Sequence, residues 1–372
     1  MTEIRLSSLH DDVRMPWQDR DKPEYSTYPQ RHANIGEHGE FSALRRIYQF
    51  GVTEDDLLQA GISDLRQMTE SQYRNLVGCA VEEQYGLIMS NIYDHWWEKQ
   101  EPEMEKAIAG TAFMVEQWET NWGIHTIQRG QDVRGQATLA LISIEGIHLL
   151  DGIKDPTQRD VDRALGMLFM NGVRSFCLQY GRDTALATNG LTELGRYTVT
   201  KLLKNGLLVD LAHSLPKTRT DTLDLAEELG RGSQISYTHG APSEAIAKDP
   251  DYAGLSEKRG LSDDEIKRIM RLDGIVGLGV SRPFFTSAEQ LAETIDRLSQ
   301  FQNGILSLAI GADFGGVSPS FLIGMNTPAE VVDKLGDLLV GRFKFNETGA
   351  QAILAENARV WIQSNLLDED HT

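Results

Sequence analysis

Two stretches decide the predicted fold, GLLVDLAHS at residues 206–214 and SQISYTHGA at residues 233–241. Each is a short apolar segment that ends on a histidine, His213 or His239, and turn-forming residues follow at once. The residues between them have the mixed polar and apolar pattern of a helix. A buried strand, a breaker and a helix leading to the next strand form a βαβ unit, so we expect both histidines at the carboxyl ends of neighbouring parallel strands.

The carboxyl ends of strands are where α/β folds place their chemistry. A single histidine at such a position is most often structural, held by a backbone carbonyl. Two histidines in adjacent repeats favour a metal or catalytic site over that interpretation.

Working outward from this unit, the whole chain reads as repeated strands separated by helical runs. We predict eight strands, at residues 4–9, 85–93, 137–144, 173–180, from 207 onward, 234–238, 274–280 and 306–312. This count predicts an α/β fold, a (β/α)8 TIM barrel that forms a single domain over residues 1–372. It exceeds the typical ~250 residues because of long loops before the third strand. Residues 41–68 are predicted to be helical, and the polar residues 14–39 to form a loop over the barrel mouth.

Metal-competent side chains fall at the predicted strand ends. Six such residues come from five strands, namely His10, Asp12, Glu145, His213, His239 and Asp313. His-x-Asp puts His10 and Asp12 on the same side of an extended strand, because side chains repeat every two residues. Six ligands exceed what one tetrahedral zinc needs and suit two metals with a shared carboxylate.

Composition limits the class of protein. The 372 residues are 40% hydrophobic and carry a formal net charge of -19, which argues against binding the phosphates of nucleic acid. Cys79 and Cys177 are the only cysteines and form no metal-type pair or disulfide framework, which suits a reducing compartment. The sequence has no secretory signal pattern and no run of about 18 apolar residues. We therefore predict a cytoplasmic protein with no membrane partner.

At its candidate ligands the chain resembles the membrane dipeptidase family, the M19 metallopeptidases, within the amidohydrolase-like barrels. The matching motifs follow the family's order along the chain, and they are LHDD at 9–12, ISIEG at 142–146, GLTELGR at 190–196, NGLLVDLAHS at 205–214, ISYTHGA at 235–241, KRGLSDDEI at 258–266 and IGADFGG at 310–316. The match is dense from residue 139 onward.

The resemblance implies a role for each position. Glu145 would bridge two divalent metals, with zinc the expected metal; His10, Asp12 and Asp313 would complete one site, and His213 and His239 the other. A hydroxide held between the metals would attack an amide carbonyl of a dipeptide. Asp313 would transfer the proton to the leaving amine, and Arg259 would hold the substrate carboxylate. Family members commonly form dimers, so a homodimer is one assembly that the resemblance implies.

Three substrate-side positions depart from the family's pattern. Tyr180 stands where the family usually has a histidine that binds the substrate carbonyl and the tetrahedral intermediate, and a phenol can still donate one hydrogen bond to an oxyanion. Gly260 replaces an asparagine, and Ser281-Arg282-Pro283 replaces an aromatic pair. The sequence thus predicts a binuclear zinc dipeptidase. Two alternatives stay open, a hydrolase of another small amide or lactone and a catalytically idle barrel whose metals hold loops together.

Overall fold

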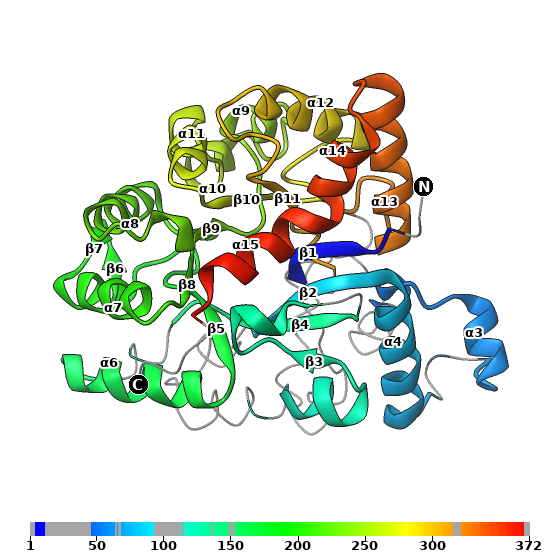
Figure 1. The fold of residues 1–372 in the computed structure, drawn as a ribbon, viewed down its shortest axis with the longest axis horizontal. Coiled ribbons are helices and arrows are strands. Elements are labelled where there is room, and N and C mark those ends of the chain that lie inside the picture. The colour runs from blue at the N-terminus through cyan, green and yellow to red at the C-terminus, as the bar shows by residue number, and fades with distance from the viewer. Residues whose placement is uncertain are drawn as a thin grey trace.

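Eight parallel strands form a closed barrel in the computed structural model of the chain (Figure 1). The structure describes residues 4–11, 46–63, 65, 68–92, 112, 115–134, 137–147, 150, 153–314 and 321–367. The barrel strands are β1 (Leu6–Asp11), β2 (Tyr85–Ile92), β4 (Leu139–Glu145), β5 (Val173–Cys177), β8 (Leu208–Asp210), β9 (Ile235–Tyr237), β10 (Ile275–Leu278) and β11 (Leu308–Ile310). Each coincides with one of the eight predicted strands, so the predicted barrel is confirmed.

The sheet closes because β1 pairs with strands from both ends of the chain. Ser8 is in register with Ile88 of β2 on one side and with Ile310 of β11 on the other. The remaining pairs follow chain order, from β2 with β4 to β10 with β11, and all are parallel. A two-residue strand, β3 (His125–Thr126), extends the sheet beside the start of β4.

The strands are short apolar runs because both of their faces are buried. Every residue of β4, β5, β8 and β9 is buried, and the sequences of these strands are accordingly mainly apolar, without a regular exchange of apolar and exposed polar residues. The carbonyl of Thr238 lies close to two glycines, Gly277 of β10 and Gly311 after β11. A Cβ at either glycine would lie 1.9 Å from the oxygen of that carbonyl. These glycines let the end of β9 lie close to its neighbours.

Helices surround the barrel (Figure 1). Their bounds are α3 (Glu54–Gln59), α4 (Glu70–Gln84), α6 (Gln158–Met170), α7 (Glu193–Lys204), α8 (Pro216–Glu228), α9 (Ser243–Ile246), α10 (Ser256–Arg259), α11 (Asp263–Arg271), α12 (Ala288–Ser299), α13 (Pro328–Asp337), α14 (Glu347–Gln351) and α15 (Asn357–Asn365). A capping box opens α11, because Ser262 accepts from the amide of Glu265 and the Glu265 carboxylate accepts from the amide of Ser262. Among the described residues no helix is long and apolar enough to cross a membrane.

The predicted helix over residues 41–68 is interrupted. The described part holds a 3₁₀ helix, η3 (Arg46–Phe50), and then α3. Gly51 separates them with a positive φ of 94°, and Thr53 caps α3 with its side chain. The predicted loop over residues 14–39 lies outside the described residues.

Helix α15 closes the amino-terminal end of the barrel. Its Ala358, Trp361 and Ile362 share a buried cluster with residues inside the barrel, such as Leu208 and Ile275. The indole of Trp361 donates to the carbonyl of Ser233, just before β9. This end is plugged, and Glu145, His213 and His239 lie at the opposite end, where the strands terminate.

Candidate metal centre

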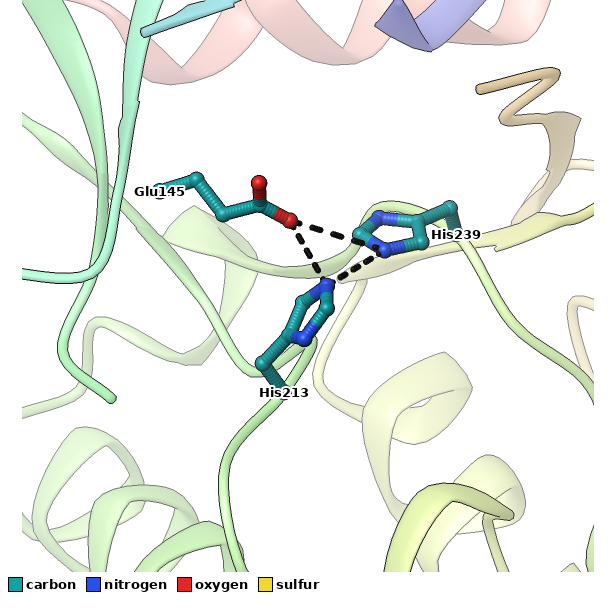
Figure 2. Close-up of side chains that lie close together, drawn as sticks. All are labelled: Glu145, His213 and His239. Carbon is teal, nitrogen blue, oxygen red and sulfur yellow. Dashed lines mark hydrogen bonds and ion pairs between the residues drawn. The ribbon is translucent and has the colours of Figure 1, made fainter. Parts of the chain in front are cut away.

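Three of the six predicted metal ligands converge at the carboxyl-terminal end of the barrel. Glu145 is the last residue of β4, His213 lies three residues after β8, and His239 lies two residues after β9. Their ligand atoms all lie within 4.8 Å of one another (Figure 2). Glu145 and His239 are buried, with 5% and 1% of their surfaces exposed. The expectation that both histidines meet at one rim is confirmed.

The distances within this group fit a metal ion held by one carboxylate and two imidazoles. Nε2 of His213 lies 2.6 Å from Oε1 of Glu145 and 2.8 Å from Nε2 of His239. The third pair, Oε1 of Glu145 and Nε2 of His239, is 3.8 Å apart. Tetrahedral zinc bonds of about 2.0–2.1 Å place neighbouring ligand atoms roughly 3.3 Å apart. Small side-chain adjustments therefore suffice to surround a cation.

A carboxylate and a hydroxyl orient the ring of His239. The hydroxyl is that of Thr238, and it lies between the carboxylate of Asp210 and the ring of His239. Its Oγ1 is 2.6 Å from Oδ2 of Asp210 and 3.1 Å from Nδ1 of His239. A carboxylate only accepts, so Thr238 donates to Asp210 and accepts from the N–H at Nδ1 of His239. Nε2 of His239 then keeps its lone pair, as a metal ligand requires.

Asp210 is itself an unusual group. It is the last residue of β8, is 1% exposed and accepts from the amides of Ala212 and Thr238, each at 3.0 Å. Burial, with a smaller effect of the negative charge of Glu145, raises the pKa of Asp210 from 3.8 to about 6, against the lowering effect of its hydrogen bonds from the hydroxyl of Thr238 and from these two amides.

Backbone conformation, a backbone hydrogen bond and ring stacking fix the position of His213. Its backbone has a left-handed φ of 61°, and its carbonyl accepts from the amide of Gly181 at 2.9 Å. The ring of Tyr180 stacks on its imidazole, with centroids 4.1 Å apart and 16° between the planes. The predicted carbonyl-binding residue Tyr180 therefore lies directly against a predicted metal ligand.

Arg259, the predicted carboxylate-binding residue, also contacts His213. It is the last residue of α10, and its guanidinium donates through Nη1 to Nδ1 of His213, with Nη2 3.3 Å from Nε2. The guanidinium carbon lies 5.8 Å from the centroid of Phe284, whose ring is 6.1 Å from that of His239. Arg259 thus reaches the metal ligands, and Phe284 forms an aromatic wall beside both.

The other three predicted ligands are less fully described. Asp313 follows β11 by three residues, with a left-handed φ of 58° and a partly exposed side chain, and it lies outside the group of three ligands. His10 is described only as part of β1, and Asp12 lies outside the described residues. A second metal position therefore stays a prediction.

Arg282, in the segment after β10, forms ion pairs within the protein instead of facing the centre. Arg282 binds Asp249 through two hydrogen bonds, of 2.6 and 2.7 Å, and Asp251 through a third of 3.0 Å. These contacts lower the pKa of Asp249 and hold the Arg282 side chain on the loop that follows β9. Phe284 is the residue of this segment that reaches His239.

The sequence interpretation missed several residues that support the site, namely Gln179, Asp210, Arg219, Thr238 and Phe284. Gln179 accepts from the amide of Leu215 at 2.9 Å and so ties the loop after β5 to the turn after His213. Asp210 had a usable signal, because a lone acid inside the apolar run LLVDLA presents a burial problem that partners must solve.

Comparisons with known proteins identify a family for most of the chain. Residues 125–371 match the family described as membrane dipeptidase, peptidase family M19. Two uncharacterized dipeptidases of Schizosaccharomyces pombe are each 23% identical, over 63% and 48% of this chain. The matches cover 54% and 42% of those proteins, so the chain spans about half the length of these curated relatives.

Solved structures show the same fold. A dipeptidase described as an M19 metallopeptidase superposes with a TM-score of 0.66 at 16% identity, covering 98% of this chain and 99% of the other. A metallopeptidase from Rhodobacter sphaeroides, bound to a phosphinate mimic of the dipeptide L-Ala-D-Ala, gives a TM-score of 0.65 at 16% identity, with coverages of 98% and 99%.

Proposed function

The chain belongs to the membrane dipeptidase family, peptidase family M19, and we propose that it is a binuclear zinc hydrolase that cleaves the amide bond of dipeptides. The observation that carries this proposal is the convergence of Glu145, His213 and His239 beside Arg259. A carboxylate and two imidazoles suit a divalent metal, and a guanidinium suits the carboxylate of a small substrate.

The ligands divide between two metal positions. Glu145, His213 and His239 would hold one ion, and Glu145 would also face a second ion held by His10, Asp12 and Asp313. The order of these residues along the strand ends supports the division. When bound, two such ions polarise a carbonyl and lower the pKa of water, so that a hydroxide forms near neutral pH.

The remaining residues would handle protons and charge. Asp313 would accept the proton of the attacking water and pass it to the leaving amine. Tyr180, stacked on His213, would donate its phenolic hydrogen to the carbonyl oxygen as negative charge develops there.

Arg259 would position the substrate. As a metal ligand through Nε2, His213 carries its ring proton on Nδ1, which then no longer accepts from Arg259. The guanidinium would turn instead to the substrate carboxylate, and two parallel hydrogen bonds would fix the scissile bond over the centre. A dipeptide offers this carboxylate one residue from its amide bond, which favours dipeptides over longer or uncharged substrates.

The experiment is hydrolysis of a dipeptide panel by zinc-loaded protein, with metal content measured in the same samples. We expect two equivalents of metal and hydrolysis that chelation abolishes. Hydrolysis of lactones or non-peptide amides, with dipeptides untouched, would support the alternative hydrolase. Two metals without hydrolysis of any of them would support a barrel whose metals hold loops together.

We extend the proposal to partners and location. The net charge of -19 argues against nucleic acid as a partner. A homodimer and a cytoplasmic location, with no membrane partner, stay predictions, to be checked by light scattering and by fractionation of cells.

A further inference from the structure

Arg219 is a buried arginine whose hydrogen bonds join three segments around the centre. It lies in the first turns of α8, is 2% exposed and ranks among the largest fully buried side chains. Nε donates to Glu265 at 2.7 Å, and Nη2 lies 3.4 Å from the same carboxylate. Glu265 is in turn fixed by its capping-box bonds to Ser262. One side of the guanidinium is thereby anchored to α11.

The other donors of Arg219 reach backbone carbonyls on both sides of Arg259. Nη1 donates to the carbonyl of Lys258 at 3.1 Å, and Nη2 donates to that of Gly260 at 3.0 Å. The carbonyl of Arg259 itself accepts from the hydroxyl of Tyr237, at the end of β9. Three consecutive carbonyls are therefore held by two buried side chains, which fixes the backbone from which the Arg259 side chain extends.

The same guanidinium also holds the turn that carries His213. Nη1 of Arg219 donates to the carbonyl of Ser214 at 2.9 Å. Ser214 directly follows His213, so one side chain spans the backbone next to a metal ligand and the backbone next to Arg259. We propose that Arg219 is a positioning residue, which sets the distance between the metal centre and the group that binds the substrate carboxylate. This inference rests on the proposed role of Arg259.

Lysine cannot replace this arrangement. The five N–H donors of a guanidinium point in fixed directions in one plane, and the five bonds of Arg219 use that fork. An ammonium carries three donors on one nitrogen and cannot span Ser214 and Gly260 together. In Arg219→Lys we therefore expect the backbone of segment 256–261 to become more mobile, although Arg259 itself is unchanged.

Arg174 offers a matched control. It is also buried, at 7% exposure, and it donates to three backbone carbonyls, those of Gln128, Phe169 and Val173. It lies at the start of β5, at the end of the barrel away from the centre. Arg174→Lys should therefore cost stability in the same way and leave the centre unchanged.

The first test is amide hydrogen exchange by mass spectrometry. The amides of Gly260 and Leu261 donate to Ser256 and Ala241, so segment 256–261 has protection to lose. Arg219→Lys should speed its exchange about tenfold, and Arg174→Lys should not. Unchanged exchange in Arg219→Lys, or an equal rise in both variants, would overturn the proposal. Should Arg219→Lys fail to fold, Glu265→Gln removes the anchoring charge, keeps an acceptor for Ser262, and should loosen the same segment.

The second test separates this inference from the proposed function. Wild type should prefer a free dipeptide over its C-terminal amide, and Arg219→Lys should lower that ratio of kcat/KM about tenfold, with Arg174→Lys unchanged. A wild type without the preference would contradict the role of Arg259, while hydrogen exchange still decides whether Arg219 holds the segment. A preference that Arg259→Lys removes and Arg219→Lys retains would refute the positioning role alone.

Discussion

Replacing Asp210 by asparagine should make the metal-free protein more stable at neutral pH. The carboxyl is 1% exposed and lies at the end of β8, and burial raises its pKa to about 6. Its three hydrogen bonds, from the amides of Ala212 and Thr238 and the hydroxyl of Thr238, only partly offset the loss of water. An asparagine of the same shape keeps an oxygen for the two amides and carries no charge.

The size of the effect follows from the two pKa values of Asp210. In the unfolded chain its pKa is near 3.8, and in the folded protein it is about 6. The folded state therefore binds the proton more tightly, so this group stabilises the fold below pH 4, and the contribution is lost as the pH rises through 6. One pKa unit corresponds to about 1.4 kcal/mol, which gives a loss of about 3 kcal/mol in the free energy of unfolding.

Urea unfolding of chelator-treated protein between pH 4 and 8 measures this change. The free energy of unfolding of Asp210→Asn, relative to wild type, should rise by about 3 kcal/mol across that range. Asp160→Asn is the control, because the pKa of this exposed carboxyl at the start of α6 is lowered by hydrogen bonds from Thr157, which gives the opposite sign. The reasoning would be refuted if the difference in the free energy of unfolding between Asp210→Asn and wild type did not vary with pH.

The same substitution should weaken metal binding. The side-chain amide nitrogen that Asp210→Asn introduces would donate to Thr238, whose hydroxyl could then donate to Nδ1 of His239. The ring proton would move to Nε2, where the metal must bind. We expect metal affinity to fall about 10- to 100-fold, measured by competition with a chelator. Stability and metal affinity would thus change in opposite directions.

Substitutions at three further residues test the proposed roles. Asp313→Asn should lower kcat at least about 100-fold while both metals stay bound, and near-normal turnover would assign the proton transfer elsewhere. Arg259→Lys should lower kcat/KM for free dipeptides about tenfold, or about 1.4 kcal/mol, and leave amidated dipeptides nearly unaffected. Thr238→Val should weaken metal binding as Asp210→Asn does, whereas Thr238→Ser should retain it; equal affinities in both would show that the hydroxyl does not orient His239.

The barrel could be predicted because its strands obey local rules. Most of the strands are mainly apolar runs that end at a breaker, and burial on both faces accounts for the nearly continuous apolar sequence of β4 and β10. The prediction of one helix over residues 41–68 missed an interruption, because the apolar periodicity continues across Gly51. The positive φ of Gly51 ends the first helix. That residues 1–372 form one domain stays a prediction.

The convergence of Glu145, His213 and His239 could be predicted because parallel strands bring their carboxyl ends to one rim. Their supporting residues could not, since those contacts depend on which segments meet in space. Arg219 lies in PKTRTDT, a polar run at the start of a helix that resembles a solvated surface. It is buried because the segment carrying Arg259, some forty residues later in the chain, folds back over it.

Backbone conformation adds to the strand-end position of two of the proposed ligands. His213 and Asp313 both follow barrel strands with left-handed φ values, of 61° and 58°. For a residue with a side chain this conformation costs on the order of 1 kcal/mol, and glycine would adopt it without that cost. In both cases the left-handed residue lies three positions past the end of its strand, where the chain leaves the barrel. Asp155, Asp273, Asn303 and Lys344 adopt the same conformation outside the proposed ligand set, so the conformation alone does not mark a ligand. At His213 and Asp313 it coincides with a strand end on the rim that carries the centre, and this coincidence supports their proposed roles as ligands.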